Sequence, residues 1–524
     1  MSENLFLGDE ALAQGALDAG LSGCYAYPGT PSTEIMEYIQ ASPEAAARGV
    51  HRSWSSNEKV AMEEALGMSY AGKRAMVCMK HVGLNVAADG FVNAAVTGSN
   101  GGLLVVAADD PSMHSSQNEQ DSRFYAQFAL IPCLEPSSQQ EAYNMAADAF
   151  NWSEQYETPL LLRLTTRLSH SRANICTAPA RAENRRREPS NPRRFTLLPA
   201  IAKQNYDRLC AKQAEFAELS DKSPYNLYYE GQDCSLGIIC TGIAGNYVQE
   251  AFAGKCPHPI LKISHYPLPQ KKLARLLAEC EKILVVEEGM PFVETQLRGP
   301  LGDPRILGRL SGALPRSGEL NTRLVQAACG LPLPPLVPPS PLVLNRPPRL
   351  CDGCPHINTY EALNQALRDY PEARVFGDIG CYTLGALPPF NAISSCVDMG
   401  ASIAMAKGAA DAGLQPAIAV IGDSTFTHSG MTGLLDAVWE NSPITVIIVD
   451  NFTTAMTGGQ TSLGYGKIEN ICLGLGVAPE HLRIFTPLPK QHDANVQVLR
   501  EEIAYPGLSV VIARRECLQT IRKK

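Results

Sequence analysis

Residues 417–451 read AIAVIGDSTFTHSGMTGLLDAVWENSPITVIIVDN, and this stretch decides the fold class of the chain. Two dense runs of aliphatic residues, at 417–421 and 444–449, flank a segment of helical character at 431–440. Unbroken aliphatic runs of this kind are typical of strands buried on both faces of a parallel sheet. The stretch therefore predicts two neighbouring parallel strands joined by a helix, within an α/β domain.

Polar residues follow both predicted strands directly. Asp423 comes just after the first strand, and Asn451 just after the second. Because the carboxyl ends of parallel strands meet at one edge of a sheet, we expect these two side chains close together where open α/β sheets bind ligands. A carboxylate and an amide oxygen there suit Mg²⁺, which completes its shell with waters and phosphate oxygens. In the plainer interpretation, Asp423 is a turn residue and Asn451 caps a loop.

Two stretches divide the chain into blocks. Residues 179–194 are rich in arginine and proline and read as a solvated basic connector. Residues 331–349 read LPLPPLVPPSPLVLNRPPR, whose prolines block both a helix and a central strand, so we expect a semi-extended strap. Three blocks remain, at 1–178, 195–330 and 350–524.

The first two blocks repeat the strand and helix pattern of the third. Strands are predicted at 75–80, 103–108, 235–240 and 282–287, with a helix at 84–96. The fold class is accordingly multidomain α/β, with parallel sheets covered by helices.

Composition excludes several classes of protein. The chain has 524 residues, with 45 Lys+Arg against 53 Asp+Glu and a net charge of −8, which argues against a dedicated nucleic-acid binder. No apolar run reaches the roughly 18 residues that span a bilayer, and residues 1–10 lack the pattern of a signal peptide. The 16 cysteines are scattered, as reduced thiols of a cytoplasmic protein are.

Longer motifs carry a resemblance to a known family. The chain resembles the alpha subunit of indolepyruvate:ferredoxin oxidoreductase, a thiamine-diphosphate-dependent 2-oxoacid oxidoreductase. The motifs in the third block that carry it are RPPRLCDGCPH (346–356), FGDIGCYTLGALPP (376–389), MGASIAMAKG (399–408), IGDSTFTHSGMTGLLDAV (421–438) and VDNFTTAMTGGQ (449–460). The first block adds GDEALAQGALDAG (8–20), GCYAYPGTPSTEI (23–35) and SWSSNEKVAMEEALG (53–67).

The resemblance implies a role for each block. Residues 350–524 would bind the diphosphate and Mg²⁺, 1–178 the pyrimidine, and 195–330 would form a transketolase C-terminal-like domain without chemistry of its own. Mg²⁺ would be held by Asp423, Asn451 and the backbone carbonyl of Thr453. The remaining cofactor-binding residues would be Gly377, Asp378, Ile379, Gly380, Cys381, Met399, Gly400, Gly422 and Ser424. Gly422 would let the diphosphate approach the backbone closely.

The resemblance also places a catalytic glutamate and a substrate side in the first block. Glu58 would hydrogen-bond N1′ of the aminopyrimidine. Ser55-x-x-Glu58 is equally a capping box opening a helix, so Glu58 as a plain cap is the alternative. Thr30 would face the substrate, and His114 or Arg123 could meet an oxoacid carboxylate. The cofactor would lie between two copies of the chain or between the first and third blocks of one copy. In the resembled family it bridges a dimer, so at least a homodimer is expected.

The sequence departs from the family in its cysteines. The family's tail, with its C-x₂-C-x₂-C-x₃-C-P runs for [4Fe–4S] clusters, is missing. Cys351-x-x-Cys354 supplies only two ligands and Cys517 stands alone, so no iron–sulfur cluster is expected in this chain.

Three functions stay open on these grounds. The first is oxidative decarboxylation of an arylpyruvate such as indolepyruvate to an acyl-CoA, with a second (beta) subunit and a separate ferredoxin-type electron carrier as partners. The second is a non-oxidative 2-oxoacid decarboxylase or carboligase. The third, a non-catalytic assembly subunit, is disfavoured because Asp423, Asn451 and Glu58 are all present.

Overall fold

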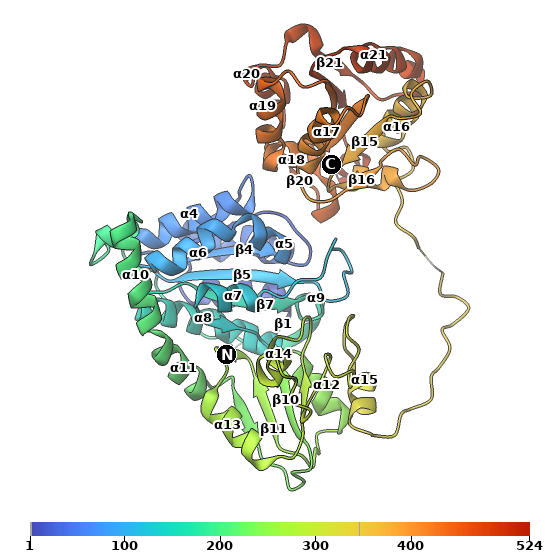
Figure 1. Ribbon diagram of the computed structural model, residues 1–524. Coiled ribbons are helices and arrows are strands. Elements are labelled where there is room, and N and C mark those ends of the chain that lie inside the picture. Colours follow the sequence, from blue (N-terminus) through green and yellow to red (C-terminus); the bar gives the residue numbers. More distant parts are fainter. Residues whose placement is uncertain (1–2, 345, 524) are drawn as a thin grey trace. The chain divides into compact units, whose positions relative to one another are not determined.

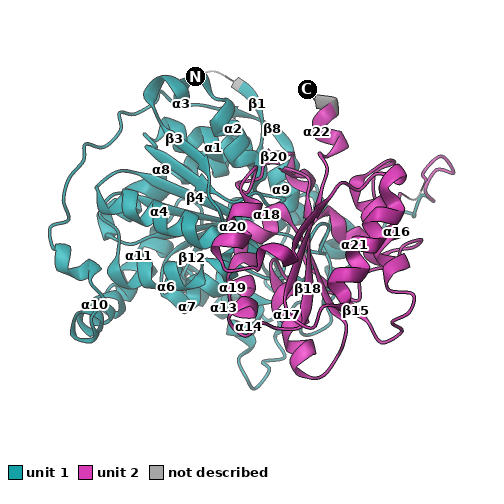
Figure 2. Cartoon of the chain, turned by 90° about the horizontal axis from the view of Figure 1, so that it is seen from above, with its two compact units in different colours: residues 1–337 teal, residues 338–524 magenta. Residues whose placement is uncertain are grey.

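The computed structural model describes residues 3–344 and 346–523, which divide into two compact units. Unit 1 covers residues 1–337 and unit 2 covers residues 338–524 (Figure 2). Among the described residues, no helix combines the length and the apolar character needed to cross a membrane. Residues 332–344 and 346–349, in the predicted strap, are exposed and form neither helix nor strand.

Unit 1 contains a seven-stranded sheet in the order β12-β6-β7-β5-β4-β2-β3. The strands are β2 (Gly23–Ala26), β3 (His51–Trp54), β4 (Ala75–Lys80), β5 (Leu103–Asp109), β6 (Cys133–Leu134), β7 (Leu160–Thr165) and β12 (His265–Tyr266). All pair in parallel except β12, which is antiparallel to β6. The predicted strands at 75–80 and 103–108 are confirmed, whereas the predicted helix at 84–96 is two helices, α5 (His81–Val86) and α6 (Ala88–Thr97).

Helices cover both faces of this sheet (Figure 1). Leu104 and Val106 of β5 pack into a core with α1 (Gly8–Asp18) and α8 (Gln139–Tyr156). Val105 and Ala107 point the other way, into a core with α4 (Glu58–Tyr70) and α6. Because successive side chains of a strand alternate between faces, a strand buried on both sides is apolar throughout.

Besides a two-stranded antiparallel sheet of β1 (Glu3–Leu7) and β8 (Arg172–Cys176), unit 1 contains a five-stranded sheet in the order β14-β13-β10-β11-β9. Its strands are β9 (Leu227–Tyr229), β10 (Gly237–Thr241), β11 (Ile260–Ile263), β13 (Ile283–Val286) and β14 (Ile306–Leu307). Only β9 runs antiparallel to its neighbour. The chain passes from β11 into β12 and so joins the five-stranded sheet to the seven-stranded sheet. The assignment of 195–330 as a separate transketolase C-terminal-like domain stays a prediction.

Unit 2 is a six-stranded, all-parallel sheet in the order β16-β15-β17-β18-β22-β21. The strands are β15 (Arg374–Gly377), β16 (Ser395–Cys396), β17 (Ala417–Gly422), β18 (Ile444–Asp450), β21 (Leu482–Phe485) and β22 (Ser509–Arg514). One face is covered by α16 (Pro355–Ala366) and α21 (His492–Ala504), the other by α17 (Ala401–Asp411) and α19 (Met431–Trp439). The α/β fold class is confirmed.

Candidate cofactor site

A pocket at the carboxyl edge of the unit 2 sheet collects most of the predicted cofactor residues. Gly422 of β17 pairs in register with Val449 of β18, so the residues that follow the two strands emerge side by side. The predicted residues that line the pocket are Ile379, Gly380, Cys381, Met399, Gly422, Asp423, Ser424, Asn451 and Thr453. Gly377, Asp378 and Gly400 are not among its lining residues.

Asp423 is the residue whose surroundings call for a cation. Its side chain is 3% exposed, and its Oδ2 atom is buried without a hydrogen-bond partner. Burial, and then the nearby charge of Asp450, raise the pKa of Asp423 to about 7. Asn451 lines the same pocket, and its Oδ1 accepts a hydrogen bond from the Thr453 N–H at 3.2 Å. A buried carboxylate oxygen without a partner is costly, and a divalent cation bound there would satisfy it, so these residues fit Mg²⁺.

Gly422 has a packing reason of its own to be glycine. A Cβ atom at Gly422 would lie 2.6 Å from a ring carbon of Tyr382, and one at Gly380 would lie 2.3 Å from the same ring atom. Both residues therefore let the Tyr382 ring pack against the backbone beneath the pocket. Close approach of a diphosphate to Gly422 stays a prediction.

Asp378 connects two elements next to the pocket through hydrogen bonds. It is fully buried and accepts hydrogen bonds from the hydroxyls of Tyr382 and Ser402, the latter at 2.7 Å. Burial raises its pKa to about 6, against the lowering effect of these bonds. Its two partners lie on separate elements, so Asp378 ties the loop after β15 to the start of α17. Gly400 precedes α17 at φ +93°, where a Cβ would lie 2.3 Å from Oγ of Ser429.

His356 is a site residue that the sequence interpretation missed. Its Nε2 lies 3.3 Å from Sγ of Cys381 and 3.4 Å from Nδ2 of Asn451. The ring is 2% exposed, and burial lowers its pKa to about 4, so the imidazole is neutral. The Cys-Pro-His sequence at 354–356 was the available signal, because it places a histidine at the start of a helix.

Four cysteines from distant parts of the sequence come together beside the pocket. Cys351 and Cys354 precede α16, Cys381 follows the loop after β15, and Cys517 lies beyond β22. The other three cysteines and Asp423 are near enough to Cys381 to add to the rise in the pKa of its thiol. Burial is the larger influence and raises the pKa of this thiol. Because the spacing along the chain gave Cys517 no partner, this convergence was not predicted.

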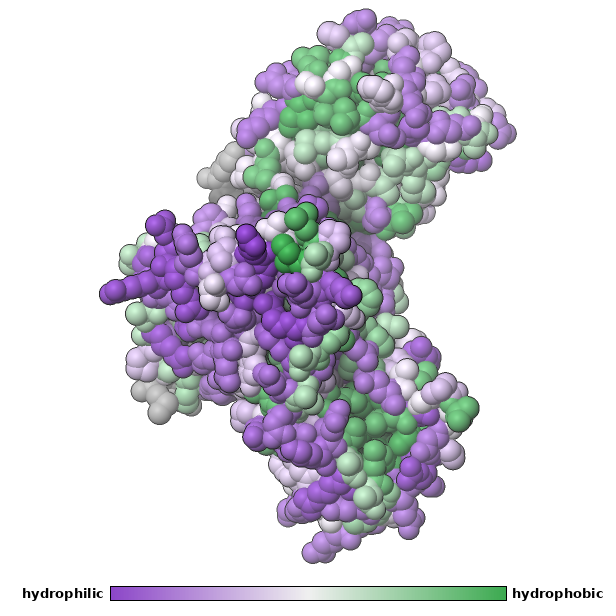
Figure 3. All heavy atoms as spheres, turned by 60° about the vertical axis from the view of Figure 1, so that its left-hand side comes forward, coloured by the Kyte–Doolittle hydropathy of each residue, from purple (hydrophilic) through white to green (hydrophobic). Residues whose placement is uncertain are grey.

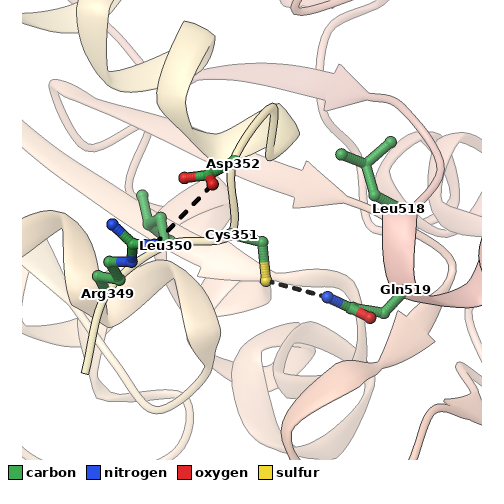
Figure 4. Close-up of a pocket in the computed structure, with 6 residues that line it drawn as sticks. All are labelled: Arg349, Leu350, Cys351, Asp352, Leu518 and Gln519. Carbon is green, nitrogen blue, oxygen red and sulfur yellow. Dashed lines mark hydrogen bonds and ion pairs between the residues drawn. The ribbon is translucent and has the colours of Figure 1, made fainter. Parts of the chain in front are cut away.

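The end of the chain carries Cys517 into this group. Its N–H donates to the carbonyl of Asn451 at 3.2 Å. Gln519, on α22 (Leu518–Lys523), donates its amide to Sγ of Cys351 at 3.4 Å, and Figure 4 shows these two side chains facing each other. These two contacts place the end of the chain beside Asn451 and Cys351.

The surroundings of Glu58 in unit 1 rule out the predicted capping box. Helix α4 begins at Glu58 itself, and its N-cap is Asn57, whose side chain accepts from the Val60 N–H at 2.9 Å. The hydroxyl of Ser55 donates instead to Glu64 at 2.5 Å. Glu58 is 6% exposed. Its assignment as the catalytic glutamate stays a prediction.

The structure gives this prediction a sharp test in Gly83 of α5. A Cβ atom at Gly83 would lie 2.6 Å from both Cγ and Oε1 of Glu58, so Gly83→Ala must displace the glutamate. A displacement of this kind costs about 10- to 100-fold in rate when the displaced group is catalytic. We expect such a loss of turnover in a folded variant. The control is Gly67→Ala on α4, where a Cβ meets nothing within 4 Å; equal activity of both variants would contradict the role of Glu58.

The predicted substrate-side residues have different surroundings. Thr30 is partly exposed, and its carbonyl accepts a hydrogen bond from the Ser115 hydroxyl at 3.3 Å. The side chain of His114 is 52% exposed and lies 3.6 Å from Glu319. The roles of both in substrate binding stay predictions.

Arg123 is buried rather than open to a ligand. Its guanidinium contacts Asp121 at 2.5 Å and Glu287 at 3.1 Å, and also donates to the hydroxyl of Tyr266 at 3.2 Å. It is 1% exposed. These partners accept the hydrogen bonds of the guanidinium within the protein. A structural role for Arg123 therefore stands beside the predicted contact with a substrate carboxylate.

Lys80, at the carboxyl end of β4 in the unit 1 sheet, is a buried cation that was not predicted from the sequence. It ends β4, is 8% exposed, and donates from Nζ to the Ser115 carbonyl at 2.7 Å. Ser115 in turn bonds to Thr30, so Lys80 and Thr30 share a neighbour. Burial lowers the pKa of Lys80 to about 8, although the charge of Asp110 opposes the shift. A lysine that closes an otherwise apolar strand was the available signal.

Two models of known protein families match this chain, one within unit 1 and one within unit 2. The family model "Pyruvate flavodoxin/ferredoxin oxidoreductase, thiamine diP-bdg" matches residues 14–214, which include Thr30 and Glu58. The model "Thiamine pyrophosphate enzyme, C-terminal TPP binding domain" matches residues 378–475, which include Asp423 and Asn451.

Relatives that match nearly the whole of this chain are also found. The indolepyruvate oxidoreductase subunit IorA of Pyrococcus abyssi is 38% identical, over 98% of this chain and 85% of the relative. The subunit IorA of Archaeoglobus fulgidus is 38% identical, over 98% of this chain and 86% of the relative. A solved 2-oxoglutarate:ferredoxin oxidoreductase from Magnetococcus marinus gives a TM-score of 0.48 at 19% identity, over 58% of this chain and 61% of that one, too low to carry an argument.

Proposed function

This chain belongs to the family of indolepyruvate oxidoreductase subunits IorA, which are thiamine-diphosphate-dependent 2-oxoacid oxidoreductases, and from that premise we propose its reaction. The chain oxidatively decarboxylates an arylpyruvate such as indolepyruvate to an acyl-CoA, using thiamine diphosphate and Mg²⁺. The observation that carries the proposal is the pocket in which the unpartnered carboxylate oxygen of Asp423 and the amide of Asn451 line one wall.

The residues of unit 2 would hold the diphosphate end of the cofactor. Asp423, Asn451 and the carbonyl of Thr453 supply hard oxygen ligands to Mg²⁺. Met399 and Ile379 line the same pocket and offer apolar surface to the rings. When bound, thiamine diphosphate supplies the electron sink that breaking a carbon–carbon bond next to a carbonyl requires.

Glu58 of unit 1 would hydrogen-bond N1′ and so control the protonation state of the aminopyrimidine. It is nearly buried at the start of α4, and Gly83 leaves room for its carboxyl against α5. A carboxyl kept away from water can hold one hydrogen bond to N1′ in a fixed direction. Thr30 is the proposed substrate contact, and Lys80 beside it is the cation available to a carboxylate; His114 and Arg123 complete the predicted set.

The experiment that tests the proposal is turnover of a panel of 2-oxoacids by the purified chain. Aldehyde release and dye reduction are followed in parallel, with and without coenzyme A. Dye reduction that depends on an arylpyruvate, and coenzyme A consumption once an electron acceptor is added, are the expected results. Rapid aldehyde release that is indifferent to coenzyme A and to every acceptor would favour the second candidate, a non-oxidative decarboxylase or carboligase.

Electrons are proposed to leave through a separate iron–sulfur partner. The sequence pattern predicts that the purified chain contains no cluster, and the alternative is a cluster held by the four cysteines near the pocket. Iron and acid-labile sulfide analysis separates these outcomes, and absence of both is the result that the sequence pattern predicts. Stoichiometric iron that is lost in Cys517→Ser and kept in Cys472→Ser, a buried cysteine elsewhere in unit 2, would place a relay in this chain.

A homodimer, with a second (beta) subunit as a further partner, is part of the proposal. Hydrophobic residues form patches on the face of the molecule shown in Figure 3. On α19, the side chains of Leu435 and Trp439 are 51% and 87% exposed and lie one helical turn apart. Exposed apolar side chains grouped in this way mark interaction surfaces. The mass of the chain in solution, measured with cofactor bound, checks the dimer.

A further inference from the structure

Three potential metal ligands converge in unit 1, away from the residues assigned to the cofactor. Asp9 is the second residue of α1, Glu34 lies in the first turn of α2 (Thr33–Ala41), and His170 ends α9 (Thr166–His170). One ligand atom from each lies within 4.8 Å of the other two. The three residues are 25 to 161 positions apart in sequence, so the fold brings them together.

Asp9 is held in this group without a partner of its own. Its side chain is 0% exposed, and neither of its carboxylate oxygens makes a hydrogen bond. The neighbouring Ser169 hydroxyl is also buried and makes none. Burial raises the pKa of Asp9 to about 8, against a lowering effect of the nearby Ser169 hydroxyl and with a smaller upward effect from the charge of Glu34. A carboxyl buried in this way is among the costliest groups that a fold can retain, and its retention calls for a reason.

The backbone gives Asp9 little freedom to move away. A Cβ atom on the preceding residue, Gly8, would lie 2.1 Å from the carbonyl oxygen of Leu168, so the start of α1 lies directly against α9. The Gly8 N–H donates to the Ser171 carbonyl at 3.2 Å, next to His170. The positions of Asp9 and His170 are thus fixed relative to each other by backbone contacts.

The other two ligands form a rim that solvent reaches. The side chains of Glu34 and His170 are each 35% exposed, and Oε1 of Glu34 lies 3.5 Å from Nε2 of His170. The second carboxylate oxygen of Glu34, Oε2, is buried without a hydrogen bond. The cluster therefore has a buried floor, formed by Asp9, and an open side through which a small ion can enter.

We propose that Asp9, Glu34 and His170 bind a divalent cation of the Mn²⁺ type, distinct from the Mg²⁺ of the cofactor. Two carboxylates and one imidazole are a donor set that such an ion accepts. Ligand atoms about 2.1 Å from a common ion lie roughly 3 to 4 Å apart, and the 3.5 Å separation of Glu34 and His170 falls in that range. The ion neutralises two carboxylates, and waters fill its positions on the exposed side.

The competing explanation is an ion pair between Glu34 and a protonated His170, with Asp9 protonated beside it. Glu34 and His170 do interact in this way, and each shifts the pKa of the other toward its charged form. That explanation accounts for the rim of the cluster. It leaves both oxygens of Asp9 and one oxygen of Glu34 without a partner, whereas a bound cation provides one for all three residues.

The test is Mn²⁺ binding to the tag-free full chain, followed by the loss of the free-ion electron paramagnetic resonance signal. Mn²⁺ is chosen because it prefers oxygen ligands to thiolates, which keeps the 16 cysteines out of the measurement. All titrations use an Asp423→Ala background without thiamine diphosphate, so that the proposed cofactor metal is removed. In this background we expect one Mn²⁺ per chain.

Three further variants decide the outcome. Asp9→Asn keeps the size of the side chain and removes its charge, and His170→Gln removes the imidazole; each should weaken Mn²⁺ binding by about 100-fold or more. Glu37→Gln, on the exposed side of α2, is the matched control and should bind like the background. Added Mn²⁺ should also raise the melting temperature of the background and of Glu37→Gln, but not of Asp9→Asn.

The melting temperatures also show whether each variant is folded. Unchanged Mn²⁺ affinity in folded Asp9→Asn, or no bound Mn²⁺ in the Asp423→Ala background, would overturn the proposal. Neither result depends on catalytic activity, so the site can fail while the proposed reaction stands.

Discussion

Replacing Asp423 by alanine is expected to weaken binding of thiamine diphosphate and Mg²⁺ by at least about 100-fold, the upper end of the loss seen when only a supporting group of a metal ligand is removed. Asp423 is the buried carboxylate of the pocket, and its unpartnered oxygen is the one that a cation would satisfy. Isothermal titration calorimetry at fixed Mg²⁺ measures the loss. The fold should persist, because alanine removes a buried charge and leaves β17 and β18 unchanged.

The matched control for this prediction is Asp436→Ala. Asp436 lies on α19 of the same unit, with a side chain that is 68% exposed. Its replacement should leave cofactor binding unchanged. Equal affinity of Asp423→Ala and Asp436→Ala for the cofactor would show that Asp423 holds no metal.

The same carboxyl predicts how binding depends on pH. The pKa of Asp423 in the unliganded fold is about 7, raised from an ordinary 3.8. Below pH 7 a cation must displace a proton from this group, so affinity should fall by up to about tenfold between pH 7 and pH 6. The contribution of this carboxyl to the stability of the fold changes with pH in the opposite direction to metal affinity. The folded chain holds a proton that the unfolded chain releases, so this carboxyl favours folding below about pH 4, and that contribution is lost as the pH rises through about 7.

Glu58→Gln is expected to keep the fold and the cofactor and to lose most of the exchange of the cofactor's C2 proton. Glutamine fills the same space against Gly83 but cannot share a proton with N1′ as a carboxyl does. We expect a loss of about 100-fold or more, the scale of a general acid or base. Exchange is measured by quenched-flow NMR on the variant saturated with thiamine diphosphate and Mg²⁺.

Glu63→Gln, on the same helix, separates a local effect from a catalytic one. Glu63 is exposed and pairs with Lys59 one turn away, and exposed ion pairs of this kind contribute little to stability. Its exchange rate should match that of the wild type. Wild-type exchange in Glu58→Gln as well would show that Glu58 has only a structural place at the start of α4.

Strands and their carboxyl edge could be predicted from the sequence because the physical signal is local. The runs at 417–421 and 444–449 are apolar throughout, since β17 and β18 are buried on both faces. Parallel pairing then places Asp423 and Asn451 together without any knowledge of distant residues. The pocket residues on other elements, such as Ile379 and Met399, came only from the resemblance to the family.

The capping-box pattern gave the wrong N-cap for α4, because Ser55 and Asn57 are both residues that can cap a helix. Ser55-x-x-Glu58 fits a capping box, but Asn57 lies closer to the helix and caps it, so Ser55 bonds to Glu64 instead. The pattern described a helix start correctly and placed it two residues too early.

Contacts between distant residues were beyond the sequence pattern. His356 reaches Asn451, 95 residues later, because α16 covers one face of the sheet and its first turn lies beside Asn451. Cys517 joins Cys354 and Cys381 through the return of the chain after β22. Asp9 and His170 meet because α1 lies directly against α9. Each depends on packing between elements, which spacing along the chain does not encode.

Activation of thiamine diphosphate by this chain would be seen in the exchange rate of the C2 proton on the wild-type protein. The cofactor is bound with Mg²⁺ at pH 7, deuterium oxide is mixed in, and NMR of the quenched cofactor gives the rate. We expect exchange that is faster than in free thiamine diphosphate by orders of magnitude. Exchange at the rate of the free cofactor, with binding confirmed in the same sample, would contradict this expectation.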